Sequence, residues 1–167
     1  MAELVQGRIW VLGDDISTDH ILPSRYMAEI RPEELRRHVL EGVARDFPRK
    51  IEAGDILVAG RNMGYGSSRE QAILALKAAG IKAIVARSYS RIFFRNCINN
   101  GFLAVACPGL PKGLKDREVM TIDPGGGRIQ VAGEEFSCEP FPEVLLAVLK
   151  HGGLIEYLAV NPQEYRR

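Results

Sequence analysis

The sequence predicts a three-layer α/β domain with a β-rich flank. Three short, continuous apolar runs are typical of parallel strands that are buried on both faces. They cover residues 55–60, 81–86 and 102–106. Helical stretches with an apolar stripe lie between these runs, which is the pattern of consecutive β-α-β units. Further along, two strand-like segments flank the turn Pro124-Gly125-Gly126-Gly127 and predict an antiparallel hairpin of residues 119–123 and 128–131.

The remaining elements follow from the same local signals. Residues 7–13 form an apolar run that ends in a turn, so they predict the first strand. A polar, turn-rich stretch follows over residues 14–24. Proline in a first turn, serine before a helix and glycine after one then mark the helix limits. The expected helices cover residues 31–40, 69–79, 90–100 and 141–150, with a short helix and a tail behind them.

Composition bounds the class of protein. The 167 residues, taken as residues 1–167 of one domain, are enough for a single core, and 46% of them are hydrophobic. The 22 Lys and Arg residues against 21 Asp and Glu give a net charge of +1, which argues against nucleic acid or an anionic membrane as the partner. We see no apolar run of about 18 residues and no signal peptide, and so expect a cytoplasmic protein.

The cysteines predict neither disulfides nor a metal site in this chain. Cys97, Cys107 and Cys138 are odd in number and widely spaced, unlike a disulfide framework or a Cys-x-x-Cys pair. They also match no pattern of iron–sulfur ligands. We therefore expect reduced cysteines that fill the core.

The most informative segment is the loop over residues 60–69. Its three glycines allow positive φ and a close approach of the backbone to a ligand. Ser67 and Ser68 stand at the expected helix start, where free N–H groups favour an anion, and Arg69 adds a bidentate donor for a carboxylate or phosphate. This is an anion site with two hydroxyl groups beside it, or else a serine cap followed by a solvated arginine.

Two alternatives to an enzyme of carboxylate chemistry stay open at this point. The loop lacks the Gly-Lys-Ser/Thr of a Walker A motif and the third glycine of a dinucleotide fingerprint. However, Arg87-Ser88 follows about twenty residues later and is suited to the 2′-phosphate of NADP. A regulatory module that binds an anion without chemistry would have the same helix start.

Three motifs resemble the swivelling domain of the aconitase superfamily. Gly64-Tyr65-Gly66-Ser67-Ser68-Arg69-Glu70 is similar to the superfamily's GxGSSRE signature. Ser17-Thr18-Asp19-His20-Ile21 resembles its TDxI element, and residues 88–101 resemble the segment after the signature. Order and spacing match over roughly residues 4–160. A free-standing domain of this length resembles the small-subunit family of 3-isopropylmalate dehydratase and homoaconitase.

The resemblance implies a fold, a reaction and a partner. The fold would be a three-layer β/β/α swivelling domain, and the reaction the movement of water across a double bond of a hydroxy-acid in leucine biosynthesis. A separate large subunit would hold a [4Fe-4S] cluster, and this chain would bind no metal. Ser67 would be the base, Ser68 and Arg69 would bind a substrate carboxylate, and Gly66 would lie against the substrate. Alone, the chain is open to self-association.

In this family, the loop after the TDxI element helps to choose the substrate. Homoaconitase-like members carry an arginine two residues after a tyrosine, whereas this chain has Ala28 two residues after Tyr26. Ala28 favours an alkyl-substituted malate, namely isopropylmalate. Homoaconitate or another alkylmalate stays an alternative, because Arg25 or Arg31 can fold inward.

Asp19 and His20 are the remaining candidates. Either residue could support the active site from behind the substrate-binding groups. For His20 in particular, a structural hydrogen bond within its own loop is the competing expectation.

Overall fold

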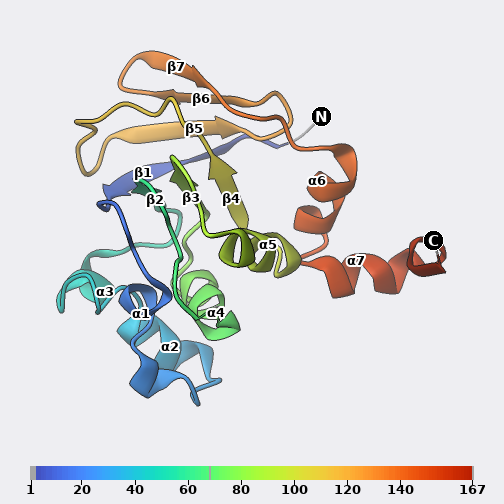
Figure 1. Cartoon of the computed structure of the whole chain (residues 1–167), viewed down its shortest axis with the longest axis horizontal. Coiled ribbons are helices and arrows are strands. Elements are labelled where there is room, and N and C mark those ends of the chain that lie inside the picture. The colour runs from blue at the N-terminus through green and yellow to red at the C-terminus, as the bar shows by residue number, and fades with distance from the viewer. Residues whose placement is uncertain (1–2, 68, 167) are drawn as a thin grey trace.

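The computed structural model describes residues 3–67 and 69–166 of the chain. Within them, one seven-stranded sheet has the strand order β4-β3-β2-β1-β5-β6-β7 (Figure 1). The strands are β1 (Val5–Val11), β2 (Ile56–Ala59), β3 (Ala83–Ala86), β4 (Leu103–Ala106), β5 (Val119–Asp123), β6 (Arg128–Val131) and β7 (Glu134–Ser137). Strands β1 to β4 are parallel, and β5, β6 and β7 continue the sheet from β1 in antiparallel pairs.

The helices gather mainly on one side of the parallel strands. They are α1 (Thr18–Ile21), α2 (Pro32–His38), α3 (Phe47–Lys50), α4 (Glu70–Ala78), α5 (Arg91–Asn99), α6 (Glu143–Lys150) and α7 (Leu154–Val160), with 3-10 turns η1 (Ser24–Tyr26) and η2 (Pro162–Arg166). In Figure 1, α1, α2 and α4 lie below the parallel strands, and the antiparallel strands lie above them. The sheet therefore curls over itself, and the order of layers is β/β/α.

The parallel strands are buried on both faces, which explains their uninterrupted apolar sequences. In β2, Leu57 packs in the core that includes the helices, whereas Ile56 and Val58 pack in the core under the antiparallel strands. In β3, Ile84 packs in the core that includes the helices, and Val85 packs in the core under the antiparallel strands. Successive side chains of a strand point to opposite faces, so a strand between two cores needs an apolar residue at every position.

The expected layers and strands are confirmed, with four differences in detail. The first strand lies at Val5–Val11 rather than over residues 7–13. α1 forms inside the stretch expected to be only turns, and β7 was not predicted because half of its residues are charged and only Phe136 packs on the core. Residues 31–40 end their helix at His38, before Gly42, because Val39 is extended with a ψ of 129° and Leu40 adopts a φ of 59°.

The cysteines occupy the places expected for apolar residues. Cys97 and Cys107 are buried, and Cys138 is half-buried. Among the helices of the described residues, none has the length and hydropathy needed to cross a bilayer.

A buried carboxylate ties the first two strands together. Asp55, only 2% exposed, accepts hydrogen bonds from the indole Nε1 of Trp10 (2.7 Å) and the backbone N–H of Glu52 (2.9 Å). Arg8 Nη2 lies 3.4 Å from the other carboxylate oxygen. A buried charge is tolerated when it is paired in this way, and loss of the carboxylate leaves buried donors without partners.

We predict that Asp55→Ala lowers the free energy of unfolding by about 2–4 kcal/mol, because the indole N–H and part of the arginine charge lose their acceptor. The measurement is urea denaturation followed by tryptophan fluorescence. Asp46→Ala is the matched control, since it removes only an exposed pair with Lys50 (2.8 Å), and we expect at most about 0.5 kcal/mol from it. Equal effects of the two substitutions would contradict the assignment of Asp55 as a structural anchor.

Candidate active site

The ends of three parallel strands meet at one edge of the sheet. The backbone N–H of Gly60, after β2, donates to the carbonyl of Gly13, after β1 (3.2 Å). The N–H of Arg87, after β3, donates to the carbonyl of Gly60 (3.0 Å). A cleft of about 340 Å³ opens here, lined in part by these three residues. The carboxyl ends of parallel strands are the usual position of ligand sites in α/β folds.

The loop over residues 60–67 is bonded to the segment before α1. Gly64 donates its N–H to the carbonyl of Ile16 (2.6 Å), and Thr18 donates its N–H to the carbonyl of Tyr65 (3.0 Å). The buried hydroxyl of Thr18 donates to the carbonyl of Ser67 (2.8 Å). The backbone on which Ser67 stands is therefore held from one side by three hydrogen bonds.

The same loop is bonded on its other side to the segment before α5. The N–H of Met63 donates to the carbonyl of Ser88 (3.0 Å), and the N–H of Ser90 donates to the carbonyl of Met63 (2.9 Å). The hydroxyl of Ser88 accepts the N–H of Asn62 (2.8 Å). The loop is thus a short strand-like bridge between two segments far apart in the sequence.

Two glycines are required by the path of this loop. Gly64 has a φ of 81°, and a Cβ atom there would lie 2.1 Å from the ring of Phe93. Gly66 has a φ of 96°, a conformation that other residues adopt rarely. The Gly-x-Gly part of the motif therefore has a steric cause in the scaffold, beside any role toward a ligand.

The helix behind the loop starts later than expected. α4 begins at Glu70, and Arg69 occupies the N-cap position with extended backbone angles and no side-chain cap bond. Ser67 thus precedes the first turn, and it is not the helix cap that the sequence allowed. Its side chain is exposed, and among the described residues its hydroxyl has no hydrogen-bond partner. Ser68 lies outside the described residues.

Asp19 and Arg69 bring opposite charges to the edge of the loop. Asp19 accepts the N–H (2.8 Å) and the hydroxyl (2.6 Å) of Ser24. These two bonds, with a smaller contribution from the charge of Arg69, hold the pKa of Asp19 below its ordinary value. Asp19 is therefore ionised at neutral pH, and it lies close enough to the half-buried Arg69 to feel its charge.

His20 has a local structural role. Its Nδ1 lies 2.9 Å from both the backbone N and the hydroxyl of Ser17, and its own N–H donates to that hydroxyl (3.2 Å). This reciprocal capping box fixes the start of α1. The hydrogen bonds of His20 thus lie within its own loop, next to Thr18.

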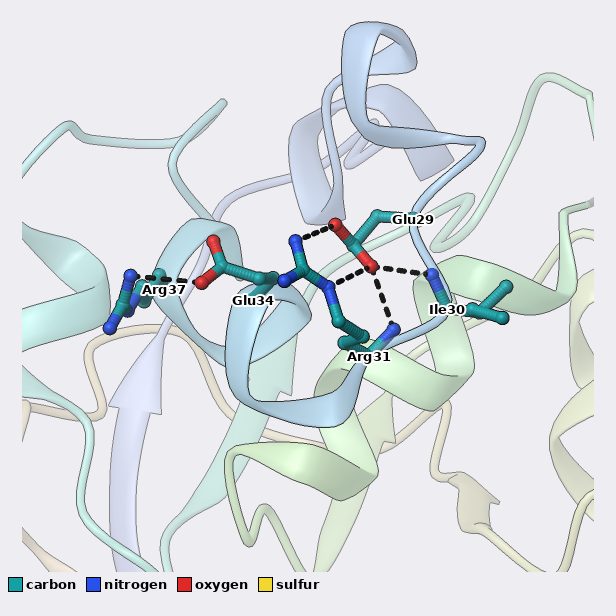
Figure 2. A network of polar contacts seen from close by, with 5 residues as sticks. All are labelled: Glu29, Ile30, Arg31, Glu34 and Arg37. Atoms are coloured by element: carbon teal, nitrogen blue, oxygen red, sulfur yellow. Dashed lines mark hydrogen bonds and ion pairs between the residues drawn. The ribbon is translucent and has the colours of Figure 1, made fainter.

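The segment between α1 and α2 carries Ala28 with an arginine on either side. Ala28 is exposed. Arg25 pairs with Glu41 through Nη2 and Oε1 (2.5 Å), and Arg31 pairs with Glu29 through Nη2 and Oε2 (2.9 Å). Figure 2 shows the second pair, in which the guanidinium of Arg31 faces the carboxylate of Glu29. Neither arginine therefore folds inward with a free charge.

The residues present do not fit an iron–sulfur cluster. No group of three or more His, Cys, Asp or Glu among the described residues is arranged to hold a metal ion. Burial raises the pKa of Cys107 and Cys97, so both thiols disfavour the thiolate form that ligates iron. Cys138, half-buried, has a pKa of about 11 for the same reason.

The chain matches one family model and many named proteins. The Aconitase C-terminal domain model matches residues 22–109, which include Ala28 and the whole glycine-rich loop. The 3-isopropylmalate dehydratase small subunit 1 of Methanopyrus kandleri is 46% identical over 95% of this chain and 94% of its own length. The isopropylmalate/citramalate isomerase small subunit of Methanocaldococcus jannaschii is 41% identical over 95% of each chain.

Two further matches are a homoaconitase subunit and a solved structure. The methanogen homoaconitase small subunit of Methanothermobacter thermautotrophicus is 42% identical over 94% of this chain and 92% of its own length. A crystal structure of 3-isopropylmalate dehydratase from Methanocaldococcus jannaschii superposes with a TM-score of 0.88 at 37% identity, covering 98% of each chain. These matches favour hydro-lyase chemistry over the dinucleotide and regulatory alternatives.

We predict that Thr18→Val loosens the loop that carries Ser67, because the valine side chain cannot donate to the Ser67 carbonyl. The free energy of unfolding should fall by about 1 kcal/mol, and the amide of Gly64 should exchange with solvent several-fold faster. Thr18→Ser keeps the hydroxyl and should behave like the parent in hydrogen exchange followed by NMR. Identical exchange in the Val and Ser variants would show that the hydroxyl does not hold the loop.

We also predict that Glu29 stays ionised down to about pH 2. The hydrogen bonds from the Arg31 side chain and backbone lower its pKa from 4.5 to about 2. A lowered folded-state pKa means that the pair adds stability above about pH 4.5, and that this contribution is lost as the pH falls through about 2. Titration of the Glu29 carboxyl carbon by NMR measures this, and Arg31→Gln should bring the pKa back toward 4.5. A parent value near 4.5 would rule out the pair in solution.

Proposed function

Because the chain belongs to the aconitase C-terminal domain family, among the small subunits of 3-isopropylmalate dehydratase and its relatives, we propose that it is the small subunit of a heteromeric hydro-lyase. The complex isomerises 2-isopropylmalate and 3-isopropylmalate through dehydration and rehydration, in leucine biosynthesis. A homoaconitase or another alkylmalate dehydratase is the alternative. The observation that carries the proposal is an exposed Ser67 on a loop anchored at three strand ends, beside Arg69.

In this proposal, Ser67 is the base. Its oxygen takes the proton from the substrate carbon next to the carbon that loses the hydroxyl group, and it returns that proton when water adds to the other carbon. A serine hydroxyl is a poor base at neutral pH, so its anionic form needs stabilisation. The cation of Arg69 and the N-terminus of α4 supply positive potential at this place.

The neighbouring groups bind the substrate. We assign Ser68 and Arg69 to one substrate carboxylate, because a guanidinium can bind a carboxylate through two hydrogen bonds. Gly66 has no side chain, so the backbone can approach the substrate closely. Asp19 holds the start of the segment over residues 23–31 through Ser24, and it keeps a negative charge near Arg69. His20 contributes by capping α1.

The substrate assignment rests on the segment around Ala28. A methyl group cannot pair with a carboxylate, and Arg25 and Arg31 are each neutralised by a glutamate. This surrounding suits the isopropyl group of isopropylmalate. It is unsuited to the additional carboxylate of homoaconitate, although a homoaconitase subunit is among the relatives.

The proposal also includes a partner subunit and a cellular compartment. A large subunit would complete the active site and hold the [4Fe-4S] cluster, since the described residues of this chain offer no ligand set. Residues 1–167 would act as one domain in the cytoplasm. Without the large subunit, the surface that it covers would favour self-association.

The test is co-expression with a candidate large subunit, followed by anaerobic cluster reconstitution. Formation of the unsaturated acid is then measured from 3-isopropylmalate and from homocitrate. We expect a stable complex that turns over 3-isopropylmalate and at most traces of homocitrate. Preferred turnover of homocitrate would refute the substrate assignment, and failure to form a complex would refute the subunit assignment.

We predict that Ser67→Ala lowers kcat of the complex by at least about 10²-fold, because the group that moves the proton is lost. Assembly with the large subunit and the affinity for substrate should stay within about threefold, measured by size-exclusion chromatography and calorimetry. Ser137→Ala, an exposed serine on β7, is the control. A Ser67→Ala complex with parental kcat would exclude Ser67 as the base.

A further inference from the structure

Both arginines that flank Ala28 are neutralised by glutamates. The segment over residues 23–31 follows α1 directly, and its start is tied to α1 through Asp19 and Ser24. Its start therefore lies near the loop of Ser67, because Asp19 binds Ser24 and its pKa also responds to the charge of Arg69, while α1 holds that loop through Thr18. In the proposed function this segment helps to choose the substrate, so an arginine with a free guanidinium on it would offer a carboxylate-binding group. The pairing partners of these arginines thus decide which charges the substrate meets.

The pair of Arg31 and Glu29 is locally complete. Oε1 of Glu29 accepts the backbone N–H groups of Ile30 (2.9 Å) and Arg31 (2.8 Å) and also Nε of Arg31 (3.1 Å), while Oε2 accepts Nη2 (2.9 Å). Figure 2 shows these four contacts converging on one carboxylate. The bidentate geometry fixes the guanidinium just before α2.

The pair of Arg25 and Glu41 is built into a larger cluster. Glu41 binds Arg25 through Oε1 (2.5 Å) and His38 Nδ1 through Oε2 (2.7 Å). The ring of Tyr26 stacks on His38 at 3.7 Å between centroids, and the guanidinium of Arg25 lies 4.7 Å from the centroid of the Tyr26 ring. Glu41 is 20% exposed, so this carboxylate is well placed to hold the segment against the chain after α2.

We propose that Glu29 and Glu41 are specificity-determining residues: they hold the guanidinium groups of Arg31 and Arg25, so that the site accepts an alkyl-substituted dicarboxylate and rejects a substrate with one more carboxylate. This inference rests on the proposed function and adds residues beyond Ala28 to the choice of substrate. Rejection of a competitor by leaving its charge unpaired is a general route to specificity.

The physical consequence of removing a glutamate charge is direct. Glutamine at position 29 keeps an amide oxygen for the backbone N–H groups, but it no longer binds the guanidinium as an ion pair. Arg31 then has two N–H donors available to a substrate carboxylate. A charge-assisted contact made equally in the ground and transition states lowers KM and leaves kcat nearly unchanged.

The experiment compares Glu29→Gln, Glu41→Gln and the double variant in the complex with the large subunit. We measure kcat and KM for 3-isopropylmalate and for homocitrate. The ratio of kcat/KM for homocitrate to that for 3-isopropylmalate should rise about tenfold or more in Glu29→Gln and further in the double variant, mainly through the KM of homocitrate. Adding Arg31→Gln to Glu29→Gln should reverse the rise, because it removes the freed cation.

Glu34→Gln is the matched control. Glu34 pairs with Arg37 at 2.9 Å on α2, a pair also drawn in Figure 2, where no contact joins it to Glu29, and both residues lie outside the 23–31 segment. An unchanged ratio in all glutamate variants, or an equal rise in Glu34→Gln, overturns the inference. Turnover of 3-isopropylmalate by the parent complex separates this failure from that of the proposed function, since a parent complex without that activity refutes the proposed function itself.

Discussion

The backbone bridge over residues 60–67 is the constraint on which the site depends. Its amides and carbonyls are bonded to residues 13–18 on one side and 87–90 on the other, so three strand ends and two helix starts share one set of contacts. Gly64 lies against Phe93 with no room for a side chain, which fixes the loop to α5. These groups are bonded in the free chain, so the backbone that carries Ser67 is already held in place. In the proposed enzyme, such preorganisation would make a weak base useful.

The apolar pattern of the sequence was sufficient to predict the layers of the fold, but not the elements at their edges. The continuous apolar runs of β2 and β3 predict two buried faces because each residue must meet a core. β7 offers no such signal, since it is held by pairing with β6 and by the packing of Phe136. α1 is four residues long and depends on the capping box of Ser17 and His20, which local hydrophobicity does not report.

The candidate site, too, was predicted from the sequence only in part. The motif Gly-x-Gly-Ser-Ser-Arg predicts which residues would carry the chemistry, and this stays a prediction. It does not predict that α4 begins at Glu70 or that Thr18 donates to the carbonyl of Ser67. The partner of Arg25 was equally hard to predict, because Glu41 is sixteen residues from Arg25 in the sequence. Contacts of this kind arise from the folded path of the chain. In the proposed enzyme, the loop supplies the proton chemistry, and the paired charges around Ala28 supply the choice of substrate.

The most direct test of this account is the structure of the complex with the large subunit and bound 3-isopropylmalate. The account predicts that the Cα atoms of residues 60–67 move by less than about 1 Å from their positions in the free chain, as in other preorganised sites. It also predicts that the Ser67 oxygen lies within about 3.5 Å of the substrate carbon that loses its proton. A rebuilt loop, or a Ser67 directed away from the substrate, would contradict the central claim that the strand ends hold a preformed base.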